Sequence, residues 1–275
     1  MPSTARALAP SSEPAWHDDA SAALTEIEAL QLAATAAVRR TVSADGALSA
    51  ELIEREQHAA HGLAWLATYV QAIREMLAYL QRLSSEGRFG ETEELLTRIG
   101  IGEYLAQIFG GIPMSQGEII RLGDFGLGAD IVARHRSDAV ERLIAGGNTV
   151  ANRKRLAELI DQADAHGTIG DPGVDETLEA MRGEIRKYAE AEVLPHAHEW
   201  HRKNEYIPLA VIEGLSALGV FGLTIPEEFG GMGLGKVEMC LVSEELSRAY
   251  IGVGSLGTRS EIAAELILSG GTNEQ

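Results

Sequence analysis

The amino-acid sequence predicts an all-α protein: a helical bundle followed by a second helical domain. Apolar residues recur every three or four positions along most of the chain, and no convincing series of alternating strands accompanies them. The clearest run has steps of 3, 4, 3, 4 and 3 residues through Leu63, Leu66, Val70, Ile73, Leu77 and Leu80. A stretch rich in Gly, Pro and Asp, HGTIGDPGVD at 166–175, divides the helical pattern in two.

The first helical part is expected to cover residues 17–165, after a disordered Pro/Ser/Ala-rich tail at 1–16. Its helices are expected over residues 17–43, 49–85, 95–109, 137–145 and 150–165. The residues SADG end the first helix, and the second carries the apolar seam, which requires a nearly parallel or antiparallel partner helix. The segment 109–128 is rich in glycine and reads as irregular. This part is therefore predicted to be a bundle with short connections.

The second helical part is expected at 175–275, after a linker at 166–174. Asp175 can cap a helix that stops before Pro195, because proline disfavours helical geometry in the residue ahead of it. Pro208 is expected in the first turn of the next helix, which Gly219 ends. Two further helices are expected at 236–249 and 255–269.

Charge argues against a nucleic-acid partner. Lys and Arg number 23 against 41 Asp and Glu, which gives a formal net charge of −18, whereas neutralising phosphates requires a basic surface. Any anionic ligand must then be held by locally placed donors, such as helix N-termini or a single arginine.

The chain carries no sign of a membrane or secretory segment. No apolar run approaches the roughly 18 residues of a membrane span, and the first fifteen residues lack the apolar core of a signal peptide. The single cysteine, Cys240, excludes an internal disulfide and is expected to be a small buried residue. We therefore expect a cytoplasmic protein.

The stretch LGVFGLTIPEEFGGMGLG, 218–235, joins two predicted helices with an unusual mixture of apolar residues and glycine. Together with EELSR at 244–248, GVGSLGTRSEIAAELIL at 252–268 and the final GGTNEQ, it resembles the N-terminal helical domain of the acyl-CoA dehydrogenase family. The motifs follow one another in the family's order, and the resemblance covers about 175–275.

The resemblance implies a FAD-dependent enzyme with an N-terminal helical, a middle β and a C-terminal helical domain. The chain stops at Gln275, about where the first of these ends, so the resemblance implies a fragment that is inactive alone. The catalytic base is expected in the missing C-terminal domain, and no residue here is assigned to catalysis or to FAD. The implied partners are an acyl-CoA substrate, an electron-transferring flavoprotein and further copies in a homo-oligomer.

The extension at 17–165 resembles that of family members that oxidise a short branched dicarboxylic acyl-CoA, methylsuccinyl-CoA, to mesaconyl-CoA in the ethylmalonyl-CoA pathway. The implied reaction is α,β-dehydrogenation of a thioester, for which hydrogen bonds to the thioester carbonyl raise the acidity of the α-carbon. Two alternatives stay open: a dehydrogenase of another short-chain acyl-CoA, or a non-catalytic helical interaction module if the chain truly ends at 275.

Arg259 is the first candidate binding residue. On a helix it shares a face with Leu256, Ile262, Ala263 and Leu266, and that face should point inward. A buried guanidinium needs an anion. We expect either the free carboxylate of the substrate, assisted by Thr258 or Ser255, or a structural pair with Glu244 or Glu245.

Phe229 and Met232 are candidates to wall the acyl pocket, with the neighbouring glycines letting the backbone turn sharply, unless those glycines simply separate two helices. Glu227 and Glu228 are interpreted as capping or solvent-facing charges. No metal site is expected: His196, His198 and His201 are close in sequence, but no cysteine or well-spaced carboxylate completes a tetrahedral set.

Overall fold

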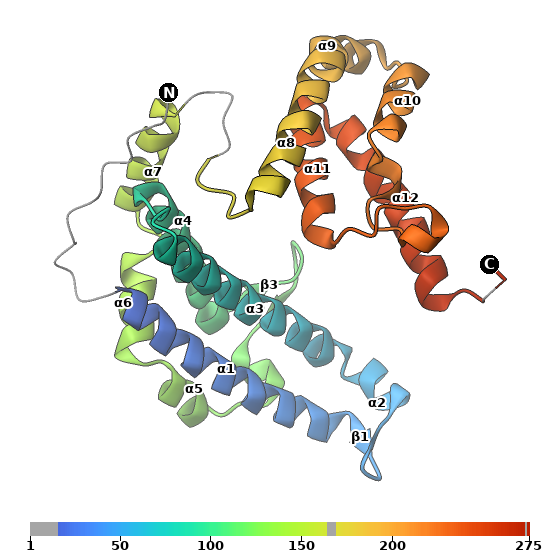
Figure 1. Cartoon of the computed structure of the whole chain (residues 1–275). Coiled ribbons are helices and arrows are strands. Elements are labelled where there is room, and N and C mark those ends of the chain that lie inside the picture. The colour runs from blue at the N-terminus through green and yellow to red at the C-terminus, as the bar shows by residue number, and fades with distance from the viewer. Residues whose placement is uncertain (1–15, 164–168, 273) are drawn as a thin grey trace. The chain divides into compact units, whose positions relative to one another are not determined.

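The computed structural model describes residues 16–163, 169–272 and 274–275, and Figure 1 shows its elements. Helices dominate the described residues, beside two short two-stranded antiparallel sheets, which confirms the predicted all-α class. The chain divides into two compact units, Met1–Gly173 and Val174–Gln275. No helix of the described residues is long and apolar enough to cross a membrane.

Residues 1–15 of the predicted disordered tail lie outside the described residues. Its last residue, Trp16, instead begins the first helix, and its side chain is buried. The Arg98 guanidinium lies over the indole ring at 5.6 Å from the ring centroid, a cation–π contact that helps to anchor the start of this helix.

Three long helices build the first unit: α1 (Trp16–Thr41), α3 (Gln57–Ser85) and α4 (Glu91–Gly110). Helix α3 packs against both α1 and α4, and α1 and α3 run side by side in Figure 1. The apolar seam of α3 is buried in this packing, as predicted, at Leu66, Val70, Ile73, Leu77 and Leu80, with Leu63 partly buried. The alternating spacing of three and four residues keeps these side chains on one stripe of the helix.

Short elements connect and cover the long helices of the first unit. They are β1 (Ser43–Ala44), β2 (Ala47–Leu48), α2 (Ala50–Arg55), β3 (Ile112–Pro113), β4 (Ile119–Ile120), a 3₁₀ turn (Leu122–Phe125), α5 (Ala129–His135), α6 (Asp138–Gly146) and α7 (Val150–Gln162). The predicted helix 49–85 is interrupted at Glu56, which ends α2 before α3 begins. Helix α2 has no buried residue that could continue the seam of α3.

The second unit contains α8 (Glu176–Tyr188), a π-helical segment (Ala189–Val193), α9 (Leu194–Lys203), α10 (Leu209–Ala217), α11 (Lys236–Ala249) and α12 (Ile251–Gly270). Two 3₁₀ turns, Val220–Gly222 and Glu227–Phe229, lie between α10 and α11. Its core gathers apolar side chains from all these helices, among them Ile185, Val193, Trp200, Leu215, Val242, Leu246 and Val253.

Two predicted helix boundaries in this unit are wrong. The first helix does not stop before Pro195, because a π-helical segment re-registers the chain and Pro195 falls in the first turn of α9, where its missing N–H has no partner to lose. The last helix begins at Ile251, four residues earlier than predicted, since Tyr250 is the single extended residue between α11 and α12. The caps at Asp175 and Gly219 follow the prediction.

Candidate functional site

The loop between α10 and α11 is a compact fold of its own. Met232 donates its backbone N–H to the carbonyl of Gly222 at 2.8 Å, and Leu234 donates to that of Leu223 at 2.8 Å. A Cβ on Gly231 would lie 2.0 Å from the carbonyl oxygen of Ile225, so no larger residue fits this approach. The glycines therefore do more than separate two helices: they close the loop on itself.

This loop and the end of α12 enclose an apolar pocket of about 450 Å³ within the second unit. Its lining residues are Ile225, Pro226, Phe229, Ala264, Ile267, Leu268, Gly271, Thr272 and Gln275. The polar side chains Thr272 and Gln275 bond to each other's backbone N–H groups at 3.4 and 2.8 Å. The acceptor oxygens of these two side chains are thus used within the segment, and the rest of the lining is mainly apolar.

The two candidates for walls of the acyl pocket, Phe229 and Met232, lie in different places. Phe229 lines the pocket and is 67% exposed. Met232 packs over Gly219, with its Sδ at 2.7 Å from where a Cβ on that glycine would lie, and it does not line the pocket. Glu227 and Glu228 lie in the short 3₁₀ turn beside Phe229, and neither is buried.

The face of α12 that carries Arg259 is exposed in this structure, not inward as predicted. Ile262 is 60% exposed and Leu266 is 69% exposed, and Arg259 is exposed beside them. The buried side of α12 instead holds Val253, Gly254 and Glu261. A Cβ on Gly254 would meet the Ser247 side chain at 1.9 Å, so this small residue selects the side on which α11 packs.

Arg259 and its two assisting hydroxyls do not form one polar cluster. Thr258 Oγ1 donates to the carbonyl of Ser255 at 2.9 Å, and Ser255 Oγ donates to that of Gly252 at 3.1 Å. No hydrogen bond or ion pair holds the Arg259 guanidinium among the described residues. It is a cation at the edge of an exposed apolar stripe.

The alternative partner, Glu245, is already occupied. Its carboxylate is 1% exposed and accepts from Arg186 Nε at 2.9 Å and Nη2 at 2.5 Å, and from Arg248 Nε at 3.2 Å. Burial alone would raise the pKa of this carboxyl, but the hydrogen bonds and charges of Arg186 and Arg248 outweigh it and lower the pKa. The predicted structural pair with Arg259 is therefore not made at Glu245, and Glu244 is exposed without a bond to Arg259.

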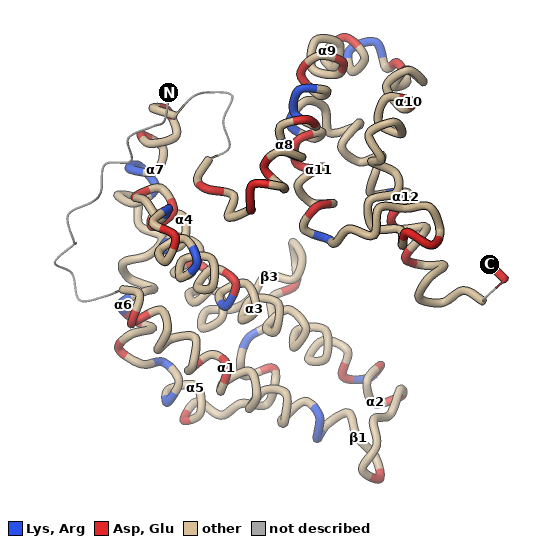
Figure 2. The backbone as a smooth tube through the Cα atoms, viewed as in Figure 1, with Lys and Arg blue, Asp and Glu red and all other residues tan. Residues whose placement is uncertain are grey.

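A second charge cluster ties α11 to α12. Lys236, at the start of α11, forms ion pairs with Glu261 and, at 2.6 Å, with Glu265. Hydrogen bonds to these two carboxylates raise the pKa of the lysine. Figure 2 shows that charged positions are spread along the helices of both units. Cys240 on α11 is exposed, which contradicts its predicted burial.

The three neighbouring histidines do not converge on a shared centre. His196 stacks on Trp200 with ring centroids 5.6 Å apart. Among the described residues, no three His, Cys, Asp or Glu side chains are grouped so as to hold a metal ion.

Comparison with known proteins identifies the second unit. Residues 175–275 match the family model for the acyl-CoA dehydrogenase N-terminal domain, which confirms the resemblance. This part of the chain is therefore similar to the N-terminal domain of acyl-CoA dehydrogenases.

One curated dehydrogenase is similar to almost the whole chain. The chain is 56% identical over 256 residues to the (2S)-methylsuccinyl-CoA dehydrogenase of Cereibacter sphaeroides, covering 93% of this chain and 46% of that protein. The mitochondrial isovaleryl-CoA dehydrogenases of Solanum tuberosum and Pongo abelii are 34% and 36% identical over 37% and 38% of this chain, and 25% of each relative. The chain thus spans less than half the length of the curated relatives it matches.

Proposed function

We propose that this chain is the N-terminal part of a FAD-dependent acyl-CoA dehydrogenase that converts (2S)-methylsuccinyl-CoA to mesaconyl-CoA. The observation that carries the proposal is the extent of the match. An alignment of 256 residues cannot be confined to the 101 residues of 175–275, so it includes the N-terminal extension as well. The isovaleryl-CoA dehydrogenases match little more than a third of the chain.

The reaction removes a proton from the α-carbon and a hydride from the β-carbon of the acyl thioester, and a bound flavin supplies the hydride acceptor. The described residues do not fit the flavin by themselves. The pocket beside Phe229 is lined mainly by apolar residues, and the acceptor oxygens of Thr272 and Gln275 already bind backbone N–H groups. We propose that this chain contributes walls that exclude water from the acyl group, with Phe229 and Met232 among them.

We further propose that Arg259 binds the free carboxylate of the substrate. Support comes from its exposure, its lack of a described partner, and the apolar residues Ile262 and Leu266 on the same face of α12. A substrate with a short branched apolar body and one carboxylate complements such a face. Thr258 and Ser255 lie within one turn on the same helix and are proposed to assist by releasing their backbone bonds.

The proposal is tested on the natural full-length product that contains this chain. Addition of (2S)-methylsuccinyl-CoA should bleach the flavin absorbance and yield a product lighter by two hydrogens. A full-length protein that lacks flavin absorbance, or that leaves methylsuccinyl-CoA unchanged, would argue against the dehydrogenase and for a non-catalytic interaction module. An electron-transferring flavoprotein as acceptor, a homo-oligomeric state and a cytoplasmic location complete the proposal.

The role of Arg259 has its own test. In Arg259→Met, kcat/KM for methylsuccinyl-CoA should fall about 10- to 100-fold, since a hydrogen bond to a charged group contributes roughly 1.5–3 kcal/mol. Activity on a neutral branched acyl-CoA should be unchanged. Arg202→Met, which changes an exposed arginine of α9, is the matched control. An unchanged preference in Arg259→Met would show that this residue does not bind the carboxylate.

A further inference from the structure

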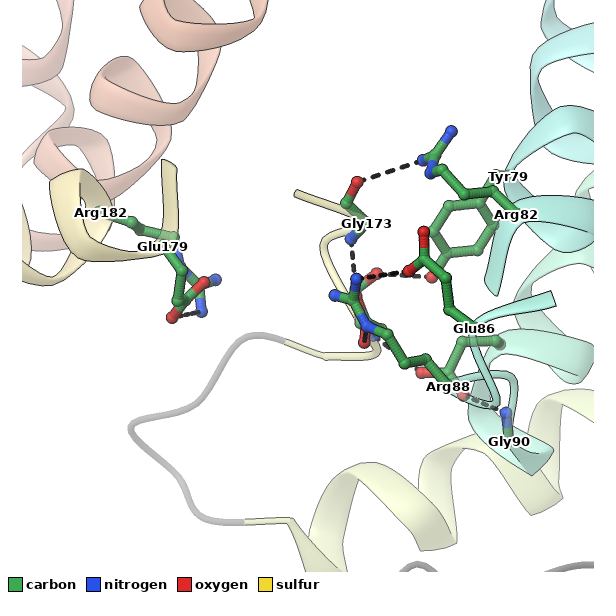
Figure 3. A network of polar contacts seen from close by, with 10 residues as sticks. Tyr79, Arg82, Glu86, Arg88, Gly90, Gly173, Glu179 and Arg182 are labelled. Atoms are coloured by element: carbon green, nitrogen blue, oxygen red, sulfur yellow. Dashed lines mark hydrogen bonds and ion pairs between the residues drawn. The ribbon is translucent and has the colours of Figure 1, made fainter. Parts of the chain in front are cut away.

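The end of the expected linker is held on the first unit by four side chains, three at Asp171 and one at Gly173 (Figure 3). Asp171 donates its backbone N–H to Glu93 Oε1 at 2.8 Å and accepts at its carbonyl from Tyr79 Oη at 2.5 Å. Its carboxylate accepts from Arg88 Nε at 2.8 Å and Nη2 at 2.5 Å, a bidentate pair. Backbone and side chain of one residue are thus bound to both α3 and the start of α4.

The residues that hold Asp171 are themselves fixed. Glu93 is buried, and its second carboxylate oxygen accepts from the backbone N–H of Gly90 at 2.9 Å, which caps α4. Burial, together with the charges of Glu93 and Asp171, raises the pKa of Tyr79 to about 12, so its hydroxyl stays a hydrogen-bond donor at neutral pH.

Gly173 ends the held segment. Its N–H donates to Asp171 Oδ1 at 2.7 Å, and its carbonyl accepts from Arg82 Nη2 at 3.3 Å. Its φ of +68° lies in the region that favours glycine, and a Cβ would lie 2.7 Å from Arg82 Nη2 and 3.1 Å from the Tyr79 ring. The next residue, Val174, packs against the core of the second unit.

We propose that Gly170–Gly173 is a fixed strap of the first unit, so that the freedom between the two units is confined to the link between Gly173 and Val174. The linker expected at 166–174 is then held on the first unit at residues 170–173 and is not flexible over its whole length. Opening the strap would release at least the four residues 170–173, about 13 Å of extended chain. The strap is a conformational device that limits how far the second unit can move from the first.

Hydrogen exchange of the 275-residue chain tests whether the strap forms. The amides of Asp171 and Gly173 should exchange at least tenfold more slowly than in an unstructured peptide, since both are hydrogen-bonded. In Asp171→Ala the Gly173 amide should lose this protection, while the helices of the first unit keep theirs. Exchange of these amides at the unstructured rate in the unchanged chain would overturn the proposal.

Two further variants keep the test independent of misfolding. Tyr79→Phe removes one hydroxyl that bonds to the strap and leaves the ring in place, and it should increase exchange at 170–173. Glu91→Ala breaks the ion pair between Glu91, in the first turn of α4, and Arg155 of α7 without removing a bond to the strap, and it should leave this exchange unchanged. Equal exchange in Tyr79→Phe and Glu91→Ala would count against the strap.

The effect on reach is measured with nitroxide labels on Cys240 and on an added cysteine, Ala151→Cys, both at exposed positions. Asp171→Ala should extend the upper end of the distance distribution by about 13 Å or more relative to the labelled parent. If hydrogen exchange shows that the strap opens in Asp171→Ala but the distribution of label distances stays the same, the strap does not limit the movement of the units and the inference fails.

Discussion

Replacing Glu245 by glutamine should unfold the second unit at a much lower denaturant concentration. Glu245 is a nearly fully buried carboxylate that accepts three hydrogen bonds from Arg186 on α8 and Arg248 on its own helix, α11. Glutamine has the same size but no charge, and it cannot accept at two equivalent oxygens. The change therefore removes the carboxylate that accepts two bonds from Arg186 and one of the two carboxylates paired with Arg248, which also binds Glu190 at 2.8 Å.

The size of the effect follows from how exposed the arginines are. Removing one partner of a fully buried ion pair costs about 3–5 kcal/mol. The side chains of Arg186 and Arg248 are 23% and 29% exposed, so water recovers part of that loss. We expect the free energy of unfolding of the second unit to fall by about 2–3 kcal/mol, which at about 1 kcal/mol per M lowers the urea midpoint by about 2–3 M.

Trp200 provides the assay. It is the one tryptophan of the second unit, and its side chain is buried. In a background in which Trp16 and Trp65 are changed to phenylalanine, its fluorescence follows this unit during urea unfolding. Glu244→Gln is the matched control, because Glu244 is exposed, and its effect should stay within about 0.5 kcal/mol. A midpoint shift in Glu245→Gln no larger than that of the control would refute the reasoning.

Three other results are expected. Leu30→Ala, at a fully buried position of α1, should destabilise the first unit by about 2–5 kcal/mol and leave the unfolding transition seen by Trp200 in place. Urea unfolding followed by circular dichroism measures this change. An unchanged unfolding transition of the first unit would exclude Leu30 from the core. Gly147→Ala should lower the melting temperature, because the new Cβ would lie 2.7 Å from Gly102 Cα, whereas Gly146→Ala meets nothing within 4 Å and should raise it; equal melting temperatures would contradict the close approach. The pKa of Glu245 is lowered from 4.5, so its stabilisation is complete above pH 4.5 and is lost as the pH falls through the folded-state pKa; the difference in urea midpoint between the unchanged chain and Glu245→Gln should shrink below pH 4.5, and a constant difference down to pH 3 would argue against the ion pair.

The long helices of the first unit could be predicted because their apolar residues recur at regular spacing in the sequence. The burial of Leu66 through Leu80 on α3 follows from spacing alone. The β1–β2 hairpin was missed, although Asp45 and Gly46 both have positive φ and the Asp-Gly pair is a strong turn signal. Strands of two residues are too short to show alternation, so only the turn could have indicated them.

The face of α12 could not be chosen from hydrophobicity. Apolar residues surround much of this helix, and a stripe through Ile262 and Leu266 looks as suitable for burial as the one through Val253. Packing is decided by Gly254, which lets α11 approach closely. Small residues do not mark this side in the sequence either, because Ser255 and Ala263 lie on the same side of α12 as Arg259.

The linker shows a different limit of sequence reasoning. Gly, Pro and Asp between two helical patterns indicate a connection, and the boundary between the two compact units falls inside it, at Gly173. Composition does not show that Asp171 binds side chains about 80 residues earlier in the chain. Such long-range pairs have no local signature in a single sequence.

The most direct measurement is the ratio of kcat/KM for (2S)-methylsuccinyl-CoA and for isovaleryl-CoA, determined with the natural full-length product that contains this chain. The proposed function and the exposed Arg259 predict a preference of at least about tenfold for the dicarboxylic substrate, since a lost charge-assisted bond costs 1.4 kcal/mol or more. Equal use of both substrates, or a preference for isovaleryl-CoA, would contradict the account.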